Sequence, residues 1–186
     1  MAPVAYNRCM TSAERDRAVS YLEETRATLV ESTRGIEASR WWRKPSPQQW
    51  CAAECVEHLS ITERHLCSVV RSMAVHPPAS EGDLALATGK EDLIVKHVPG
   101  RGRKVKGPPE SIPQLEPGDA AAVLERFLII RDRTIEFART TDHPLRTRLY
   151  PHFVFGPLDG FQWLIFMAAH SERHRRQIEE AVSAVA

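Results

Sequence analysis

Two histidines near the end of the chain, His170 and His174, are spaced to bind one metal ion. Residues four apart lie on the same face of an α-helix, about one turn from each other. Met167 and Trp163 share that face, which indicates that both imidazoles point into the protein. A buried imidazole without a partner costs free energy, which a metal ion or a hydrogen bond would offset. The alternative is a pair of histidines at the edge of the core, beside the polar residues 171–173.

A third candidate ligand, His58, lies in another segment with helical periodicity, at the margin of its apolar stripe. It can therefore face the core, although a histidine in such a position is often a core-edge residue with ordinary partners. His65, seven residues later, lies on nearly the same face. Cys51 and Cys55 precede His58, so a structural zinc site of two cysteines and one histidine competes with this interpretation. That site would need a fourth ligand and would leave the C-terminal pair of histidines unexplained.

Four segments with helical periodicity must position these histidines, and no segment shows the sustained alternation of a β-strand. We therefore predict an all-α protein, a four-helix bundle. The first helix opens at Thr11, because Glu14 completes a capping box there. The predicted helices run from Thr11 to about Gly35, from a start between Ser46 and Glu54 to His76, from Asp119 to about Thr140, and from Leu158 or Asp159 to about Ser183.

The connection between the second and third helices, from Pro77 to Gly118, is long and rich in Pro and Gly. It contains a short piece of helical character from Leu84 to Val95. A connection of this length fits two helices that start at the same end of a bundle. A shorter segment, from Asp142 to Pro157, is expected to be a loop between the last two helices.

The composition describes a single globular unit. The chain has 186 residues, 42% of them hydrophobic, so we predict one domain over residues 1–186. Lys and Arg number 25 against 24 Asp and Glu, and the net charge of +1 gives no global field to attract nucleic acid. The longest near-apolar run, from Phe161 to Ala169, is too short to span a membrane. With no export signal at the N-terminus, we expect a cytoplasmic protein whose four cysteines are free thiols.

A basic run extends from Lys96 to Lys106 and includes Arg101, Arg103 and Lys104. Such a run is usually a solvated loop, and the alternative is a site that recognises an anion. No aromatic residue interleaves with these charges, which disfavours binding of nucleic acid through the run.

The residues around His58 and those around His174 together resemble one family. Residues Gln49 to Leu59 read Gln-Trp-Cys-Ala-Ala-Glu-Cys-Val-Glu-His-Leu, which is similar to the Trp-Ser-x-x-Glu-x-x-x-His-Leu opening of the second helix in the DinB-like (DinB/YfiT) metalloenzymes. Residues His170 to Ile178 look like the H-x-x-x-H-x-x-Q-I ending of that family's fourth helix. His143-Pro144, Gly156-Pro157-Leu158 and Trp163-Leu164 match the stretch between them. The resemblance spans about residues 12–182 and departs at Cys51, where the family usually has a serine cap.

The resemblance implies up-down-down-up connectivity and one divalent metal ion bound by His58, His170 and His174. Nitrogen ligands suit Zn, Ni, Fe or Mn, and three ligands leave a coordination position open for chemistry. Glu54, one turn before His58, is then the nearest carboxylate. It would act as a base or hold a ligand in place, unless it only caps the helix.

Characterised relatives of this fold imply a small-molecule substrate and a low-molecular-weight thiol cosubstrate such as mycothiol or bacillithiol, activated at the metal. We therefore expect a metal-dependent thiol transferase or hydrolase. The alternative is a non-catalytic metal-binding or stress-response interaction protein, working as a homodimer. The family's name suggests contact with nucleic acid, which the near-neutral charge does not support.

Overall fold

The computed structural model describes residues 8–102, 107–115 and 118–185. Four long helices form its frame: α1 (Ser12–Thr33), α3 (Ala52–Met73), α6 (Ala120–Thr140) and α7 (Gly160–Ala184). Shorter elements connect them: α2 (Ala38–Trp41), α4 (Glu81–Ala87), α5 (Lys90–His97), the 3-10 helices η1 (Pro109–Ser111) and η2 (Leu145–Thr147), and the strands β1 (Leu149–His152) and β2 (Gly156–Asp159). The predicted all-α four-helix bundle is confirmed, with one small sheet added.

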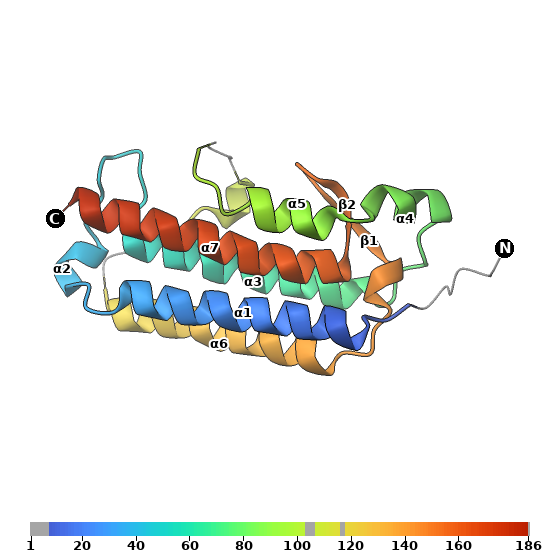
Figure 1. Ribbon diagram of the computed structural model, residues 1–186. Coiled ribbons are helices and arrows are strands. Elements are labelled where there is room, and N and C mark those ends of the chain that lie inside the picture. Colours follow the sequence, from blue (N-terminus) through green and yellow to red (C-terminus); the bar gives the residue numbers. More distant parts are fainter. Residues whose placement is uncertain (1–7, 103–106, 116–117, 186) are drawn as a thin grey trace.

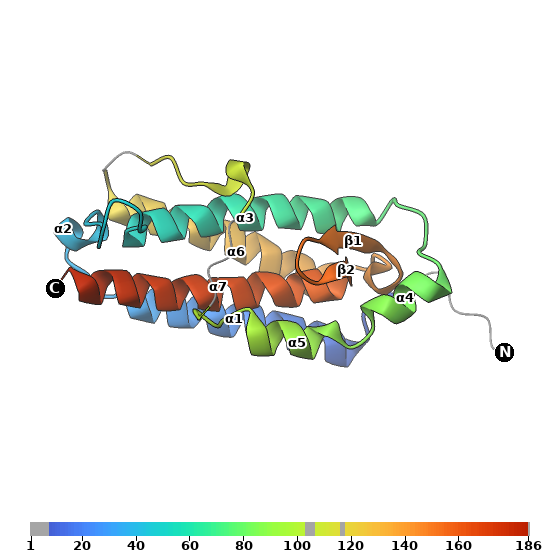
Figure 2. The ribbon, with the colours of Figure 1, turned by 90° about the horizontal axis from the view of Figure 1, so that it is seen from above.

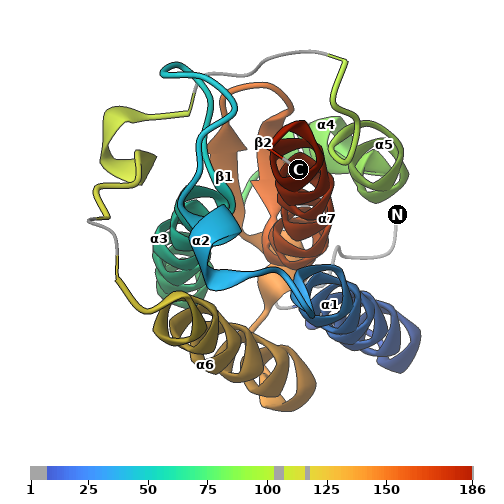
Figure 3. The same cartoon turned by 90° about the vertical axis from the view of Figure 1, so that its left-hand side faces the viewer.

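The long helices have up-down-down-up connectivity. Helices α1 and α7 run in one direction, and α3 and α6 run in the other (Figure 1). Seen end on, the four helices occupy the corners of the bundle, and α3 is a neighbour of both α6 and α7 (Figure 3). The parallel helices α3 and α6 are joined by the long crossover over residues 77–118, as its length predicts. Within this crossover, α5 packs along α7 and η1 packs on α3 (Figure 2).

Side-chain caps fix where α1 and α7 begin. Thr11 and Glu14 form the predicted capping box before α1. Asp159 accepts the backbone N–H of Gln162, and the Gln162 side chain accepts the N–H of Asp159 in return. Each box satisfies backbone N–H groups that the first turn of a helix leaves without partners. Both helices therefore begin where the sequence predicts.

The sequence leaves two starts open for α3, and the structure has the later one. The Cys51 N–H donates to Glu54 Oε2 over 2.9 Å, so α3 begins directly after Cys51 and Ser46 is not its cap. The same carboxylate pairs with Lys44 Nζ at 2.7 Å. A thiol therefore takes the place of the usual capping hydroxyl, and His58 lies about two turns into the helix.

The segment over residues 142–157, expected to be a loop, contains most of an antiparallel hairpin of β1 and β2. Gly156 has a φ of +69°, a left-handed conformation that residues with side chains rarely adopt, and it allows the chain to reverse. Lys90 Nζ donates to the carbonyl oxygens of Phe155 and Pro157, which fastens the hairpin to α5. Each strand has four residues, too few for an alternating pattern to stand out in the sequence.

The first half of α7 passes through the middle of the core. Every residue from Phe161 to Ala169 is buried, as an all-round apolar helix predicts. The helix is therefore held firmly just before the turn that carries His170. No helix in the described part of the chain is long and apolar enough to cross a membrane.

Candidate metal centre

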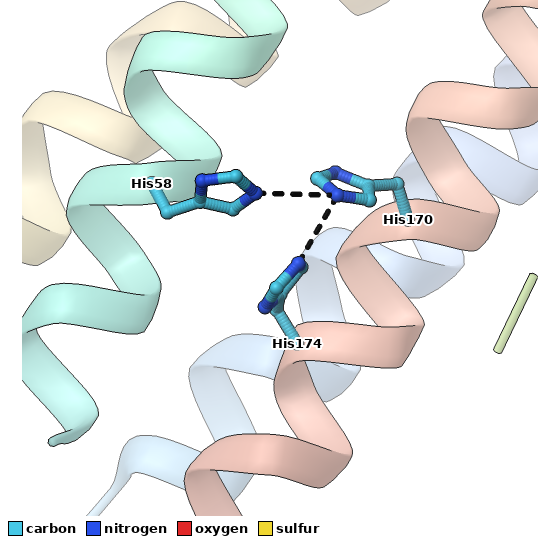
Figure 4. Close-up of side chains that lie close together, drawn as sticks. All are labelled: His58, His170 and His174. Carbon is cyan, nitrogen blue, oxygen red and sulfur yellow. Dashed lines mark hydrogen bonds between the residues drawn. The ribbon is translucent and has the colours of Figure 1, made fainter. Parts of the chain in front are cut away.

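Three histidine side chains from two helices meet between α3 and α7 (Figure 4). His58 projects from α3, and His170 and His174 project from successive turns of α7. The Nε2 atom of His170 lies 3.4 Å from Nε2 of His58 and 3.1 Å from Nε2 of His174. The possible ligand atoms all lie within 4.8 Å of one another. The structure thus brings together the three residues that the sequence identifies as candidate ligands.

This arrangement fits a small divalent ion. Nitrogen atoms about 2.0 Å from a tetrahedral zinc ion are about 3.3 Å apart, close to the two measured Nε2 distances. A metal also requires neutral imidazoles, because a protonated ring has no lone pair to donate. Burial lowers the pKa of all three histidines, and their positive neighbours lower those of His170 and His174 further. The rings are therefore uncharged at neutral pH and able to bind an ion.

The crossover fixes the orientation of His58. Its Nδ1 donates a hydrogen bond to the carbonyl oxygen of Ser111, in η1, over 2.7 Å. Because a carbonyl only accepts, Nδ1 carries the proton and Nε2 presents its lone pair to the cluster. Metal-binding histidines commonly use their second nitrogen in this way. Gly107 permits the close approach, since a Cβ there would lie only 2.8 Å from Ser111 Oγ.

Aromatic rings pack against all three histidines. Trp50 lies against His58 with ring centroids 4.8 Å apart and stacks on His174 at 6.1 Å. Phe166, one turn before His170, stacks on that ring at 5.5 Å with the planes 16° apart. Apolar rings at these positions keep water from the imidazoles and restrict their rotation. The convergence of the nitrogens is therefore held by packing as well as by the backbone.

The other candidates from α3 and its cap do not join the cluster. The Glu54 carboxylate accepts the N–H of Cys51 and pairs with Lys44, the contacts of a helix cap, and its role as a base stays a prediction. Cys51 and Cys55 are buried free thiols, and burial raises the pKa of each. In the described ranges neither belongs to a group that could hold a metal, which argues against the cysteine-containing zinc site. His65 is exposed.

The basic run begins beside the centre. The guanidinium of Arg101 donates to Gln177 Oε1 over 3.1 Å and pairs with the carboxylate of Glu180, also at 3.1 Å. These bonds fasten the crossover at Arg101 to α7, one to two turns beyond His174. Arg103 and Lys104, which belong to the same run, lie outside the described residues.

Reasoning from the sequence missed three residues that shape the centre. Ser111 is 53 positions from His58 in a Pro-rich connection, and nothing local indicates their contact. Trp50 belongs to the motif that resembles the family, but its stacking on two histidines is a tertiary contact. Phe166 could have been found, because it precedes His170 by four residues and so shares its helix face.

Comparison with known proteins agrees with this fold. The model of the DinB superfamily matches residues 21–178. The uncharacterized protein YuaE of Bacillus subtilis (strain 168) is 21% identical over 162 residues, which cover 87% of this chain and 95% of YuaE. Among solved structures, YfiT from Bacillus subtilis is described as a probable metal-dependent hydrolase with an unusual four-helix bundle topology. It is 14% identical with a TM-score of 0.59, over 97% of this chain and 90% of YfiT, and so has the same fold.

Proposed function

Because the chain belongs to the DinB superfamily, as the resemblance predicts, we propose that it is a metal-dependent enzyme that acts on a small molecule. Its centre would hold one divalent ion through His58, His170 and His174. One observation carries the proposal: three neutral imidazoles from two helices aim their Nε2 atoms at a common point.

The ligand set determines what chemistry is available. A divalent ion on three protein ligands keeps a coordination position for a small molecule and lowers the pKa of a water or thiol that binds there. Imidazole nitrogens suit Zn, Ni, Fe or Mn. The residues of this chain supply the rest: Ser111 holds His58 in the required tautomer, and Trp50 and Phe166 keep the rings in place and dry.

For the reaction itself we favour S-transfer from a low-molecular-weight thiol such as mycothiol or bacillithiol. In the described part of the chain no carboxylate belongs to the histidine cluster. The carboxylates of α3 have partners elsewhere: Glu54 caps the helix, Glu57 accepts the N–H of Gln114, and Glu63 pairs with Arg131. A thiol, whose ordinary pKa is about 8.5, needs only a modest fall in pKa to ionise at neutral pH. It therefore depends less on a protein base than water does.

Hydrolysis is the second candidate. It is the activity given for YfiT, which shares the fold of this chain. A hydrolase would need the ion to ionise water without help from the carboxylates of α3. The two candidates therefore differ in what enters the open position.

Spectroscopy of the Co(II)-substituted protein separates these candidates. Titration with bacillithiol, mycothiol or glutathione should produce a sulfur-to-cobalt charge-transfer band in the near ultraviolet, because a thiolate replaces water on the ion. The band should vanish in His174→Ala, which lacks a ligand. It should persist in Glu54→Gln and in His65→Ala, which serves as a matched histidine control on α3.

Each other outcome has a defined meaning. A cobalt spectrum that none of the three thiols changes at millimolar concentration contradicts S-transfer and leaves hydrolysis or non-catalytic metal binding. Loss of the band in Glu54→Gln would instead show that this carboxylate acts at the centre. A wild-type protein that takes up no divalent ion contradicts the metal centre itself.

A further inference from the structure

A second polar cluster lies in the core, away from the histidines. The Arg131 guanidinium is fully buried and the Glu63 carboxylate is 3% exposed. They form two parallel bonds, from Nε to Oε1 over 2.7 Å and from Nη2 to Oε2 over 2.6 Å. Taking both charges out of water costs free energy that their attraction does little more than offset. A buried pair of this kind is therefore a poor explanation for stability and calls for another role.

The Arg131 side chain connects all four long helices. It extends from α6, pairs with Glu63 of α3, and donates from Nη1 to the Leu22 carbonyl and Thr25 Oγ1 of α1. Its Nη2 also lies 3.4 Å from the carbonyl oxygen of Met167 on α7. One rigid guanidinium plane thus joins the helices at a single level of the bundle.

That level is set relative to the histidine cluster by simple helix geometry. Glu63 follows His58 by five residues, and Met167 precedes His170 by three. Since α3 and α7 are antiparallel, both steps lead in the same direction along the bundle, by about 7.5 Å and about 4.5 Å (Figure 1). The link from α3 to α7 through Arg131 therefore lies roughly one turn from the point where the two helices bring their histidines together.

We infer that Arg131 and Glu63 are positioning residues of the metal centre, which fix the axial register of α3 against α7. A shift of one helix by a single residue moves its side chains by about 1.5 Å, nearly half of the 3.1–3.4 Å between the Nε2 atoms. Apolar packing holds the helices together, but its contacts are non-directional and do not by themselves define one axial position. Arg131 adds directional contacts to both helices, two short bonds to Glu63 of α3 and a longer one, at 3.4 Å, to the Met167 carbonyl of α7. The inference rests on the proposed metal centre.

The test replaces the pair with apolar residues of similar size. Glu63→Leu/Arg131→Met removes both charges together, so no unpaired charge is left in the core. The metal-free variant should keep its helicity and a melting temperature near that of the wild type. Its affinity for Co(II) should fall about tenfold or more, as when the partners of metal ligands are lost, and its cobalt d–d bands should shift and broaden.

A matched control removes an ion pair that joins two other helices. Arg26 and Asp132 pair at 2.6 Å between α1 and α6, and both are partly exposed. Arg26→Gln/Asp132→Asn should leave the affinity for Co(II) and the spectrum unchanged. A folded Glu63→Leu/Arg131→Met variant with wild-type affinity and an unchanged spectrum overturns the positioning role. A wild-type protein that binds no Co(II) overturns the metal centre instead.

Two single variants, each with a side chain of nearly unchanged size, decide the matter if the double variant does not fold. Glu63→Gln weakens the bond between α3 and Arg131, whereas Thr25→Val removes a hydroxyl that bonds only to Arg131 and to carbonyls of α1. Glu63→Gln should weaken Co(II) binding and alter the d–d bands, and Thr25→Val should do neither. Equal effects of the two variants on Co(II) binding overturn the inference, because Arg131 would then matter only to the packing of the bundle.

Discussion

Two regions of the molecule contain buried histidines packed among aromatic rings, and they use their nitrogens in opposite ways. At the metal centre, His58, His170 and His174 aim Nε2 atoms from two helices at one another. In the hairpin, His152 lies against the rings of Phe153, Phe155, Trp163 and Phe166. Its Nδ1 accepts two N–H groups of its own hairpin, at 3.0 and 3.2 Å. Histidines in both regions are buried and have a lowered pKa. The feature that distinguishes the metal centre is that the nitrogen lone pairs of several histidines point toward one another.

The largest expected effect is on metal content. Alanine at His58, His170 or His174 should each reduce a content of about one equivalent to a small fraction, because each removes one of three ligands. His152→Ala should keep the metal, because its Nδ1 accepts hairpin N–H groups and His152 is not part of the three-histidine cluster. Metal analysis of the four purified variants measures both expectations. If His152→Ala loses its metal and His58→Ala does not, the assignment of the centre is wrong.

The next effect concerns stability at acid pH. Burial lowers the pKa of His152 from 6.5 to about 4, so folding favours its neutral form. That stabilisation is complete above pH 6.5 and is lost as pH falls from 6.5 to about 4. Between pH 7 and pH 4, the metal-free wild type should therefore lose about 3 kcal/mol more unfolding free energy than metal-free His152→Phe. His58, His170 and His174 are present in both proteins, so their contributions to the pH dependence of stability cancel in this difference.

Urea unfolding at the two pH values measures that difference. The absolute stability of His152→Phe is not the readout, because the variant also loses the acceptor for two hairpin N–H groups. Equal losses of stability in the two proteins would mean that the His152 ring is not protected from protonation in the folded state.

The smallest effect is expected for the basic run, of which Arg101 is bonded to Gln177 and Glu180 of α7. A variant with serine at positions 101, 103 and 104 loses the ion pair between Arg101 and Glu180. That pair is partly exposed, so it contributes about 1 kcal/mol or less to the free energy of unfolding. Metal content should be unchanged, and the melting temperature should fall by no more than about 4 °C. A variant that also loses affinity for an anionic substrate, with a weaker dependence on salt, would assign the run to anion recognition.

Local patterns predicted the frame of this protein. The predicted capping box at Thr11 depends on residues three apart, and the pairing of His170 with His174 depends on one helical turn. Such short-range relations are visible in the sequence because the backbone alone enforces them. Placing His58 in the centre also required the family resemblance, because His170 lies 112 residues further along the chain and His174 further still.

Contacts between distant segments could not be predicted in this way. Arg131 stands next to Asp132 and Arg133, a run that resembles a solvated helix face, and only its contact with Glu63, 68 positions away, explains its burial. The contact of Ser111 with His58 spans 53 positions and uses a backbone carbonyl, which no side-chain pattern records. Each depends on how the helices pack, which local propensity does not determine.

The hydrogen bond between Ser111 and His58 makes the crossover a thermodynamic partner of the centre. A metal ion that binds His58 in this orientation also favours the state in which Ser111 is packed against α3. By thermodynamic linkage, packing of Ser111 against α3 strengthens metal binding by the same free energy. Gly107 allows the crossover to pack closely here, because a Cβ at that position would lie 2.8 Å from Ser111 Oγ. We therefore expect the part of the crossover that contacts His58, residues 107–112, to be better protected from proteases and from hydrogen exchange when metal is bound.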